Sequence, residues 1–202
     1  MIETQRVPRV SLDGDYTVVN FLDRRRNTIR KAEFAATDDF ISGMRNVASG
    51  VVLVTTWIDN RPWGLTISSF VSVSVNPPRV LISLQSRTAS CLSILETNEF
   101  GACLLHEEHR SVAEDCSKPG TPKFFDDQAV QDRSQSDGPP RLKNSFFHMD
   151  CRVEEVVVVG DHTLFVGGVR ETVLSDGGSP LVYTAGSFHA VGKKLVADPD
   201  AK

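Results

Sequence analysis

Alternating apolar and polar residues form a clear pattern in the stretch GLTISSFVSVSVNPP, residues 64–78. The odd positions are apolar except Ser69, so the pattern predicts one β-strand whose odd face packs on the core. The even positions carry four hydroxyls and Phe70, with no charge. A solvent-facing strand usually carries Lys or Glu. This face therefore predicts either a bound ligand or a contact with another subunit.

The remaining apolar patterns predict mostly strands. Apolar and β-branched runs predict strands at 50–58, 79–85, 100–106, 151–159, 162–174 and 180–188. Three short helices are predicted at 40–48, 86–97 and 107–116, and Thr37-Asp38 is a candidate N-cap of the first. Gly160-Asp161 is a hairpin signal. This order of elements favours a β-barrel or sandwich with a few short helices over an alternating βαβ fold.

The chain of 202 residues fits one domain, which we place at 37–192. Residues 1–36 form a polar N-terminal extension with one candidate strand at 16–21, and a polar tail begins at residue 193. A stretch rich in Pro, Gly, Ser and Asp at 117–145 predicts a long loop. In a compact domain such a loop is more often functional than idle.

The charge and cysteine content narrow the class of protein. The net charge of −4 argues against a general nucleic-acid binder, which would carry a basic surplus. No apolar run approaches the roughly 18 residues of a membrane span, and the first residues contain no apolar segment of a secretory signal. The four cysteines are widely spaced and form no CxxC pair, so we expect reduced thiols in a cytoplasmic protein.

Four residues have types that bind metals: Cys103, His106, His109 and Cys116. The histidines are three positions apart, whereas the zinc protease motif HExxH separates them by four. A structural zinc site also usually shows tightly paired ligands. The pattern therefore favours a solvated helix face, and we predict no metal site.

The segment Gln85-Ser86-Arg87-Thr88 lies where a predicted strand passes into a helix. Helix N-termini present free N–H groups and partial positive charge, which suit a phosphate. An ordinary serine N-cap is the alternative. Together with the hydroxyl face of 64–78, the segment suits a ligand with a flat polar ring, a polyol and a phosphate. A flavin nucleotide has these three parts, although the residues favour a subunit contact equally.

The sequence resembles the flavin reductase-like proteins with an FMN-binding split barrel, the small reductase partners of two-component flavin monooxygenases. The resemblance spans about residues 38–192 and rests on several motifs in the family's order. These are FISGMRNVASGVVLVTT (40–56), GLTISSFVSVSVNPPRVLISL (64–84), SRTAS (86–90), GDHTLFVGGV (160–169) and PLVYTAGSF (180–188). Each motif is weak alone, and the combination is specific.

The resemblance implies a mainly β split barrel and a homodimer that holds FMN or FAD near the subunit interface. The flavin ring would be lined by Thr66, Ser68, Ser69 and Phe70. The ribityl chain and phosphate would be held by Gln85, Ser86, Arg87 and Thr88. The nicotinamide side would comprise His162, Tyr183 and Gly186, with His162 as the catalytic residue.

The chain departs from the family pattern at Arg45, where glycine is frequent, and at Val47, where phenylalanine is frequent. Ala185 replaces a commonly basic residue before Gly186. These positions bear on how the nicotinamide nucleotide is held, so the preference between NADH and NADPH stays open.

The activity that the resemblance implies is the reduction of FMN or FAD by NADH or NADPH. Hydride would pass directly to the flavin, and reduced flavin would reach a separate oxygenase. The absence of a nucleophile motif fits this chemistry, because the cofactor performs it. The alternative is a flavin-binding carrier or sensor without turnover, and a split-barrel oxidase of another substrate is a third class. Neither nucleic acid nor membrane is an expected partner.

Overall fold

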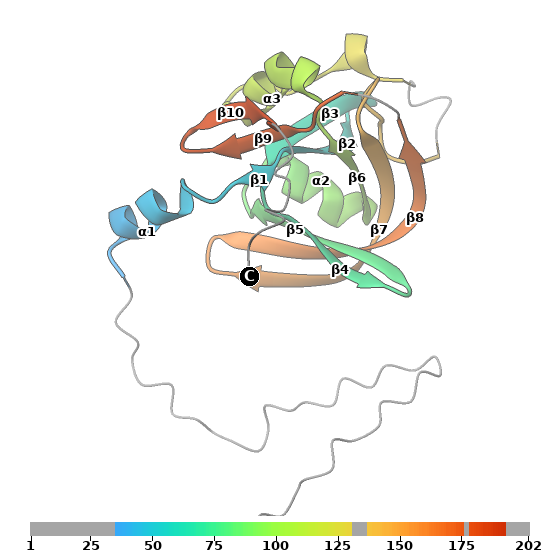
Figure 1. Cartoon of the computed structure of the whole chain (residues 1–202). Coiled ribbons are helices and arrows are strands. Elements are labelled where there is room, and N and C mark those ends of the chain that lie inside the picture. Colours follow the sequence, from blue (N-terminus) through green and yellow to red (C-terminus); the bar gives the residue numbers. More distant parts are fainter. Residues whose placement is uncertain (1–34, 131–136, 176–177, 193–202) are drawn as a thin grey trace, which may run out of the picture. The chain divides into compact units, whose positions relative to one another are not determined.

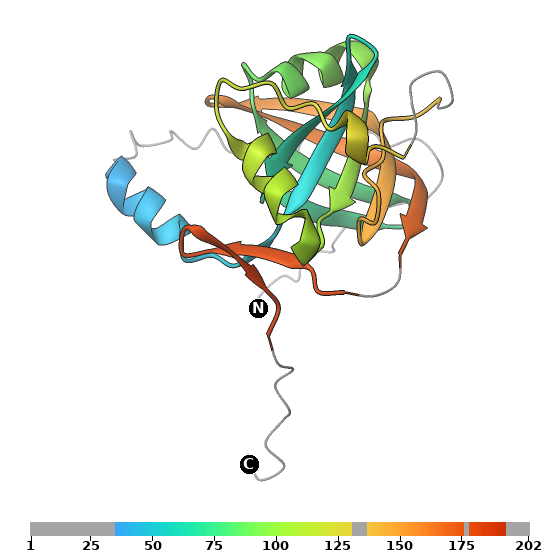
Figure 2. The same cartoon turned by 90° about the horizontal axis from the view of Figure 1, so that it is seen from above.

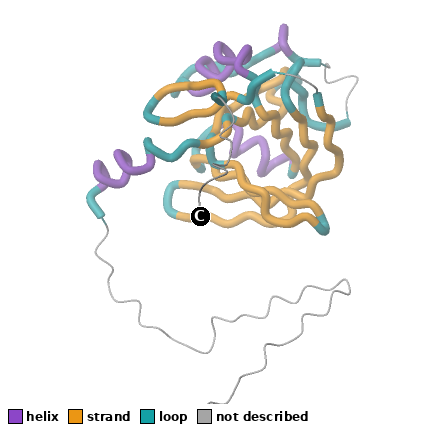
Figure 3. The backbone as a smooth tube through the Cα atoms, in the orientation of Figure 1, coloured by secondary structure: helices purple, strands orange, loops and turns teal. Residues whose placement is uncertain are grey.

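The computed structural model describes residues 35–130, 137–175 and 178–192, and strands make up about half of them (Figures 1 and 3). The chain divides into two units, Met1–Ala36 and Thr37–Lys202. The predicted strand at 16–21 lies outside the described residues. Of the described helices, none is long and apolar enough to cross a membrane.

The larger sheet has seven antiparallel strands in the order β3-β2-β6-β7-β8-β5-β4. Its strands are β2 (Val52–Ile58), β3 (Arg61–Ile67), β4 (Phe70–Val75), β5 (Pro78–Gln85), β6 (Glu99–Leu104), β7 (Phe147–Val159) and β8 (His162–Leu174). Because β3 and β4 are the two edges, the sheet curves without closing. The predicted fold class, a mainly β split barrel with a few short helices, is confirmed.

A smaller sheet pairs β1 (Ser49–Gly50), β9 (Leu181–Thr184) and β10 (Ser187–Ala190). The single strand predicted at 180–188 is therefore wrong. Ala185 and Gly186 adopt φ angles of 50° and 78°, and these left-handed conformations reverse the chain into a hairpin. Gly186 was the sequence signal for this turn.

The helices are α1 (Thr37–Met44), α2 (Ala89–Thr97) and α3 (Arg110–Ser117), with short 3₁₀ turns at Glu107–His109 and Asp126–Gln128. The three predicted helices exist with different bounds. α1 spans Thr37–Met44 rather than 40–48, so the predicted N-cap Thr37-Asp38 lies inside it. α2 begins at Ala89 rather than at 86, and the segment predicted as a helix at 107–116 is a 3₁₀ turn followed by α3. α2 contacts β2, β3, β5 and β6. Its buried residues Cys91 and Ile94 join the core of the barrel.

Two apolar clusters hold the fold together, and β2 contributes to both. Val52 and Val54 pack with residues of α2, β5, β6 and β8 inside the barrel. Val51 and Leu53 pack on the opposite face against α3 and β9. Burial on both faces explains why β2, VLVTTWI, is almost continuously apolar. The single strand predicted at 50–58 is divided, because Gly50 belongs to β1 of the smaller sheet and β2 begins at Val52.

The stretch 64–78 is two strands rather than the one predicted. The chain leaves β3 at Ile67, breaks at Ser68-Ser69, and crosses to the opposite edge of the sheet as β4. The predicted odd core face fails on β4, where Val71 and Val75 are 54% and 87% exposed. Alternation restarts after the break, and the even residue Phe70 packs against the barrel core instead.

Glycine has a definite role at two positions of the β7–β8 hairpin. Gly160 takes a φ of 59° in the tight turn, which confirms the hairpin predicted at Gly160-Asp161. A Cβ atom on Gly167 would lie 2.6 Å from the Phe100 ring, so this glycine allows the ring to pack on the strand.

Candidate functional site

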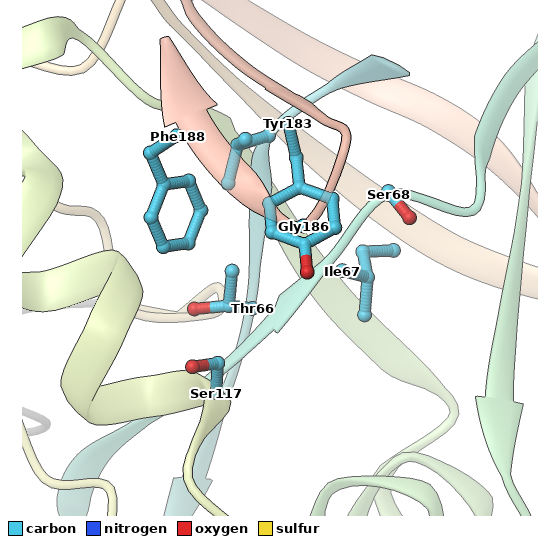
Figure 4. Close-up of a pocket in the computed structure, with 8 residues that line it drawn as sticks. Thr66, Ile67, Ser68, Ser117, Tyr183, Gly186 and Phe188 are labelled. Atoms are coloured by element: carbon cyan, nitrogen blue, oxygen red, sulfur yellow. The ribbon is translucent and has the colours of Figure 1, made fainter. Parts of the chain in front are cut away.

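Two adjoining cavities lie at the break between β3 and β4. The larger has a volume of about 620 Å³. The smaller, shown in Figure 4, has a volume of about 310 Å³. Both are lined by Thr66, Ile67, Ser68 and Ser117. The hydroxyl-rich end of β3 is thus a wall common to both.

The larger cavity collects most of the residues predicted to bind flavin. It is lined by Thr66, Ser68, Ser69, Gln85, Arg87 and Thr88, together with His162. Phe70 and Ser86 do not line it. The Phe70 ring lies 6.0 Å from that of Phe147, on the core side of β4.

The hydroxyls of β3 and the break are held by the backbone. Thr66 Oγ1 donates to the Ala113 carbonyl at 2.9 Å, and Ser69 Oγ donates to the Ser83 carbonyl at 2.7 Å. With their protons engaged, both oxygens can accept hydrogen bonds from a ligand. Ser68 is exposed, and its hydroxyl makes no hydrogen bond to another residue of the described ranges. It can therefore serve as donor or acceptor.

The start of α2 forms another wall of the larger cavity. Thr88 is the N-cap, because its Oγ1 accepts from the Cys91 N–H at 3.3 Å and donates to the Gln85 carbonyl at 2.9 Å. The alternative interpretation of this segment was a serine N-cap, but the capping residue is a threonine. Ser86 instead shares a hydrogen bond of 2.9 Å with Thr163 Oγ1, which joins the end of β5 to β8.

Two lysines of the predicted long loop also line the larger cavity, and sequence reasoning missed both. Lys123 is only 9% exposed, and its Nζ donates to the Lys118 carbonyl. Burial lowers the pKa of Lys123. Lys118 is exposed and pairs with Asp115. None of the described residues that line this cavity is acidic, so its lining favours an anion.

His162 begins β8 and stands opposite Gln85 of β5. Its Nδ1 lies 2.7 Å from Asp161 Oδ1, and this hydrogen bond lowers the pKa of the Asp161 carboxyl. Its side chain is 47% exposed. The predicted nicotinamide-side residues are therefore divided between the cavities. His162 lines the larger, whereas Tyr183 and Gly186 line the smaller.

The smaller cavity combines aromatic rings with hydroxyls. Tyr183 and Phe188 come from the two strands of the β9–β10 hairpin, and their ring centroids lie 5.3 Å apart. Tyr183 projects from β9 toward the end of β3 (Figure 4). No charged side chain lines this space among the described residues. An uncharged aromatic ring would fit it better than a phosphate.

The four residues weighed as metal ligands do not form a site. Cys103 lies in the core with its Sγ 3.3 Å from His148 Nδ1, and His109 Nε2 is bonded to the Lys143 carbonyl at 2.9 Å. The expected solvated helix face is wrong, because His109 and Cys116 are 8% and 2% exposed. Within the described ranges, no group of three or more His, Cys, Asp or Glu could hold a metal ion.

The larger cavity is lined by hydroxyls, by basic side chains and by the start of α2, and this lining suits an anionic ligand. Comparison with known proteins gives the family. The model of the "Flavin reductase like domain" family matches residues 44–192, so the chain belongs to this family.

Characterised relatives and solved structures agree with this assignment. The reductase component of the 4-nitrophenol 4-monooxygenase/4-nitrocatechol 2-monooxygenase of Rhodococcus opacus is 34% identical over 74% of this chain and 78% of its own. The NADH:riboflavin 5'-phosphate oxidoreductase of Streptomyces pristinaespiralis is 34% identical over 74% of this chain and 85% of its own. The styrene monooxygenase flavin reductase of Pseudomonas putida S12 superposes with a TM-score of 0.69 at 26% identity, over 78% of this chain and 99% of that one.

Proposed function

We propose that this protein is an NAD(P)H-dependent flavin reductase that reduces FMN or FAD and supplies reduced flavin to a separate monooxygenase component. The observation that carries the proposal is the pair of adjoining cavities with a common hydroxyl wall. One is lined by basic side chains, and the other is uncharged and lined by aromatic rings. Two ligands that must meet, a flavin nucleotide and a nicotinamide, match this division.

The larger cavity fits a flavin nucleotide. Its hydroxyls at Thr66, Ser68 and Ser69 would bind the polar edge of the ring system. Arg87, Lys123 and the N-terminus of α2 would hold the phosphate, with Gln85 and Thr88 beside the ribityl chain. Phe70 and Ser86 do not line the cavity and would support the flavin site indirectly. Phe70 would fix the position of β4, and Ser86 that of the end of β5.

The smaller cavity fits the nicotinamide ring, between Tyr183 and the end of β3. When bound, flavin accepts a hydride from the nicotinamide and carries the electrons to an oxygenase. The protein's own part is to orient the two rings and to exclude water between them. His162 lines only the larger cavity, so as the catalytic residue it would act on the nicotinamide from the flavin side of the common wall.

We further propose that a second copy of the chain covers one face of the sheet. Directly paired residues of antiparallel strands share a face, which places Val71 and Leu81 beside the pair Val157 and Leu164. Val71 and Val157 are 54% and 47% exposed. The face continues to His162, so a homodimer would bury these valines and close the cavity. Sedimentation velocity should show a dimer, and Val157→Glu should give a monomer.

We place the enzyme in the cytoplasm, where NAD(P)H is supplied and the four buried, unpaired cysteines would stay reduced.

Steady-state oxidation of NADH and NADPH, with FMN, FAD or riboflavin added, tests the activity. We expect oxidation that depends on flavin with at least one nucleotide. Tight flavin binding without turnover with either nucleotide would overturn the reductase proposal and establish a carrier or sensor.

A further inference from the structure

The smaller cavity lacks any charged side chain among its described lining residues, yet the proposed co-substrate is an anion. A nicotinamide ring placed there brings the diphosphate of its dinucleotide to the cavity mouth, only one ribose away. Two negative charges at that point call for a cation near the β9–β10 turn. The cation must come from a neighbouring segment.

Arg45 lies in such a segment, the turn that follows α1. The Arg45 carbonyl accepts a hydrogen bond of 2.6 Å from the Ala185 N–H, and the next residue, Gly186, lines the cavity. A second bond of 3.4 Å runs from Thr184 Oγ1 to the Asn46 carbonyl. Figure 2 shows the β9–β10 hairpin alongside this end of α1. The two turns are thus joined at the edge of the cavity.

The Arg45 side chain is available for a ligand. It is exposed, and its guanidinium makes no hydrogen bond or ion pair with another residue that the structure describes. The space beside the hairpin turn is open, because a Cβ atom on Gly186 would meet nothing within 4 Å. A planar guanidinium suits paired phosphate oxygens better than an ammonium does.

We propose that Arg45 binds the diphosphate of the nicotinamide dinucleotide at the mouth of the smaller cavity. This rests on the proposed reductase function and adds a specificity residue outside the cavity lining. The simpler alternative is that Arg45 stabilises the C-terminus of α1, where a positive charge is favourable. Only the first role depends on the phosphates of the nucleotide, so a hydride donor without phosphates separates the two.

The test compares Arg45→Ala with the wild type on two hydride donors, NADH and the phosphate-free 1-benzyl-1,4-dihydronicotinamide. Arg45→Ala should raise the KM for NADH at least about tenfold, as expected for losing a hydrogen bond to a charged group. Its kcat and its rate with the benzyl donor should stay unchanged. Arg45→Lys should recover part of the loss. Arg152→Ala, which removes an exposed arginine that lines neither cavity, is the matched control.

Calorimetric titration with NAD⁺ gives a readout that needs no turnover. Arg45→Ala should weaken NAD⁺ about tenfold and leave FMN affinity unchanged. Equal losses on both donors, a loss confined to NADPH, or a lower melting temperature with unchanged NAD⁺ affinity would each overturn the proposal. If the wild type oxidised neither donor with any flavin, the reductase function would fail, and the NAD⁺ titrations would still decide the role of Arg45.

Discussion

Replacing Lys123 with Met should weaken FMN binding strongly and leave riboflavin binding nearly unchanged. Lys123 is the most deeply buried cation in the lining of the larger cavity, and Met keeps most of its volume while removing the charge. FMN differs from riboflavin only by its phosphate. The difference between the two ligands therefore isolates the contact of Lys123 with that phosphate.

The magnitude follows from the burial of the lysine. A hydrogen bond to a charged group contributes about 1.5–3 kcal/mol, which corresponds to about 10- to 150-fold in Kd. At 9% exposure, Lys123 is shielded from the solvent screening that makes surface pairs weak. We therefore expect the upper half of that range.

The preference for FMN over riboflavin should depend on pH in one direction. Burial lowers the pKa of Lys123, so this side chain loses its proton at a lower pH than an exposed lysine does. The advantage of FMN over riboflavin should decline as the pH rises through the Lys123 pKa. In Lys123→Met this decline should be missing.

Flavin fluorescence titration of the apoprotein gives both affinities. Lys143→Met is the matched control, because Lys143 also donates to a backbone carbonyl, that of Asp127 at 3.0 Å, and lines neither cavity. Thermal unfolding of each variant checks that the loop remains folded. An equal loss of FMN and riboflavin in Lys123→Met would refute the reasoning, since Lys123 would then support the loop rather than the phosphate.

Three further predictions concern other sites. His162→Ala should leave flavin affinity nearly unchanged but slow flavin reduction in stopped-flow measurements; a wild-type rate at every nucleotide concentration would reduce His162 to a turn residue. Gly167→Ala should destabilise the fold by about 1–3 kcal/mol in urea, because its Cβ would lie 2.6 Å from the Phe100 ring. Burial lowers the pKa of His148 from 6.5 to about 4. The neutral ring contributes to the free energy of unfolding in full above about pH 6.5, and this contribution, up to about 3 kcal/mol, is lost as the pH falls toward 4. In His148→Gln the free energy of unfolding should depend less on pH over this range.

Local sequence pattern predicted best the elements in which a strong local preference coincides with the packing. The run VLVTTWI of β2 is buried on both faces and is a strand, as its β-branched residues indicate, although the predicted range 50–58 also took in Gly50 of β1. β8 spans His162–Leu174 as predicted, because a glycine with positive φ fixes the turn before it. In both cases the local preference and the tertiary packing agree.

The errors occurred where the chain changes partner within an apparently continuous pattern. Apolar alternation resumes in the same phase after Ser68-Ser69, although the strand before them and the strand after them lie at opposite edges of the sheet. Local sequence pattern also failed to predict part of the candidate site. Lys123 lines the cavity because of the course of a long loop, and no local sequence pattern distinguishes it from an ordinary surface lysine.

The wall common to both cavities limits how the enzyme can be redesigned. Thr66, Ile67 and Ser68 border both spaces, so under the proposed assignment of the two ligands a substitution there would change the affinity for the flavin and for the nucleotide together. Any effect of one bound ligand on the other through this segment must also be reciprocal. Engineering of nucleotide preference should therefore start at Phe188, and engineering of flavin preference at Arg87, because each lines only one of the two cavities.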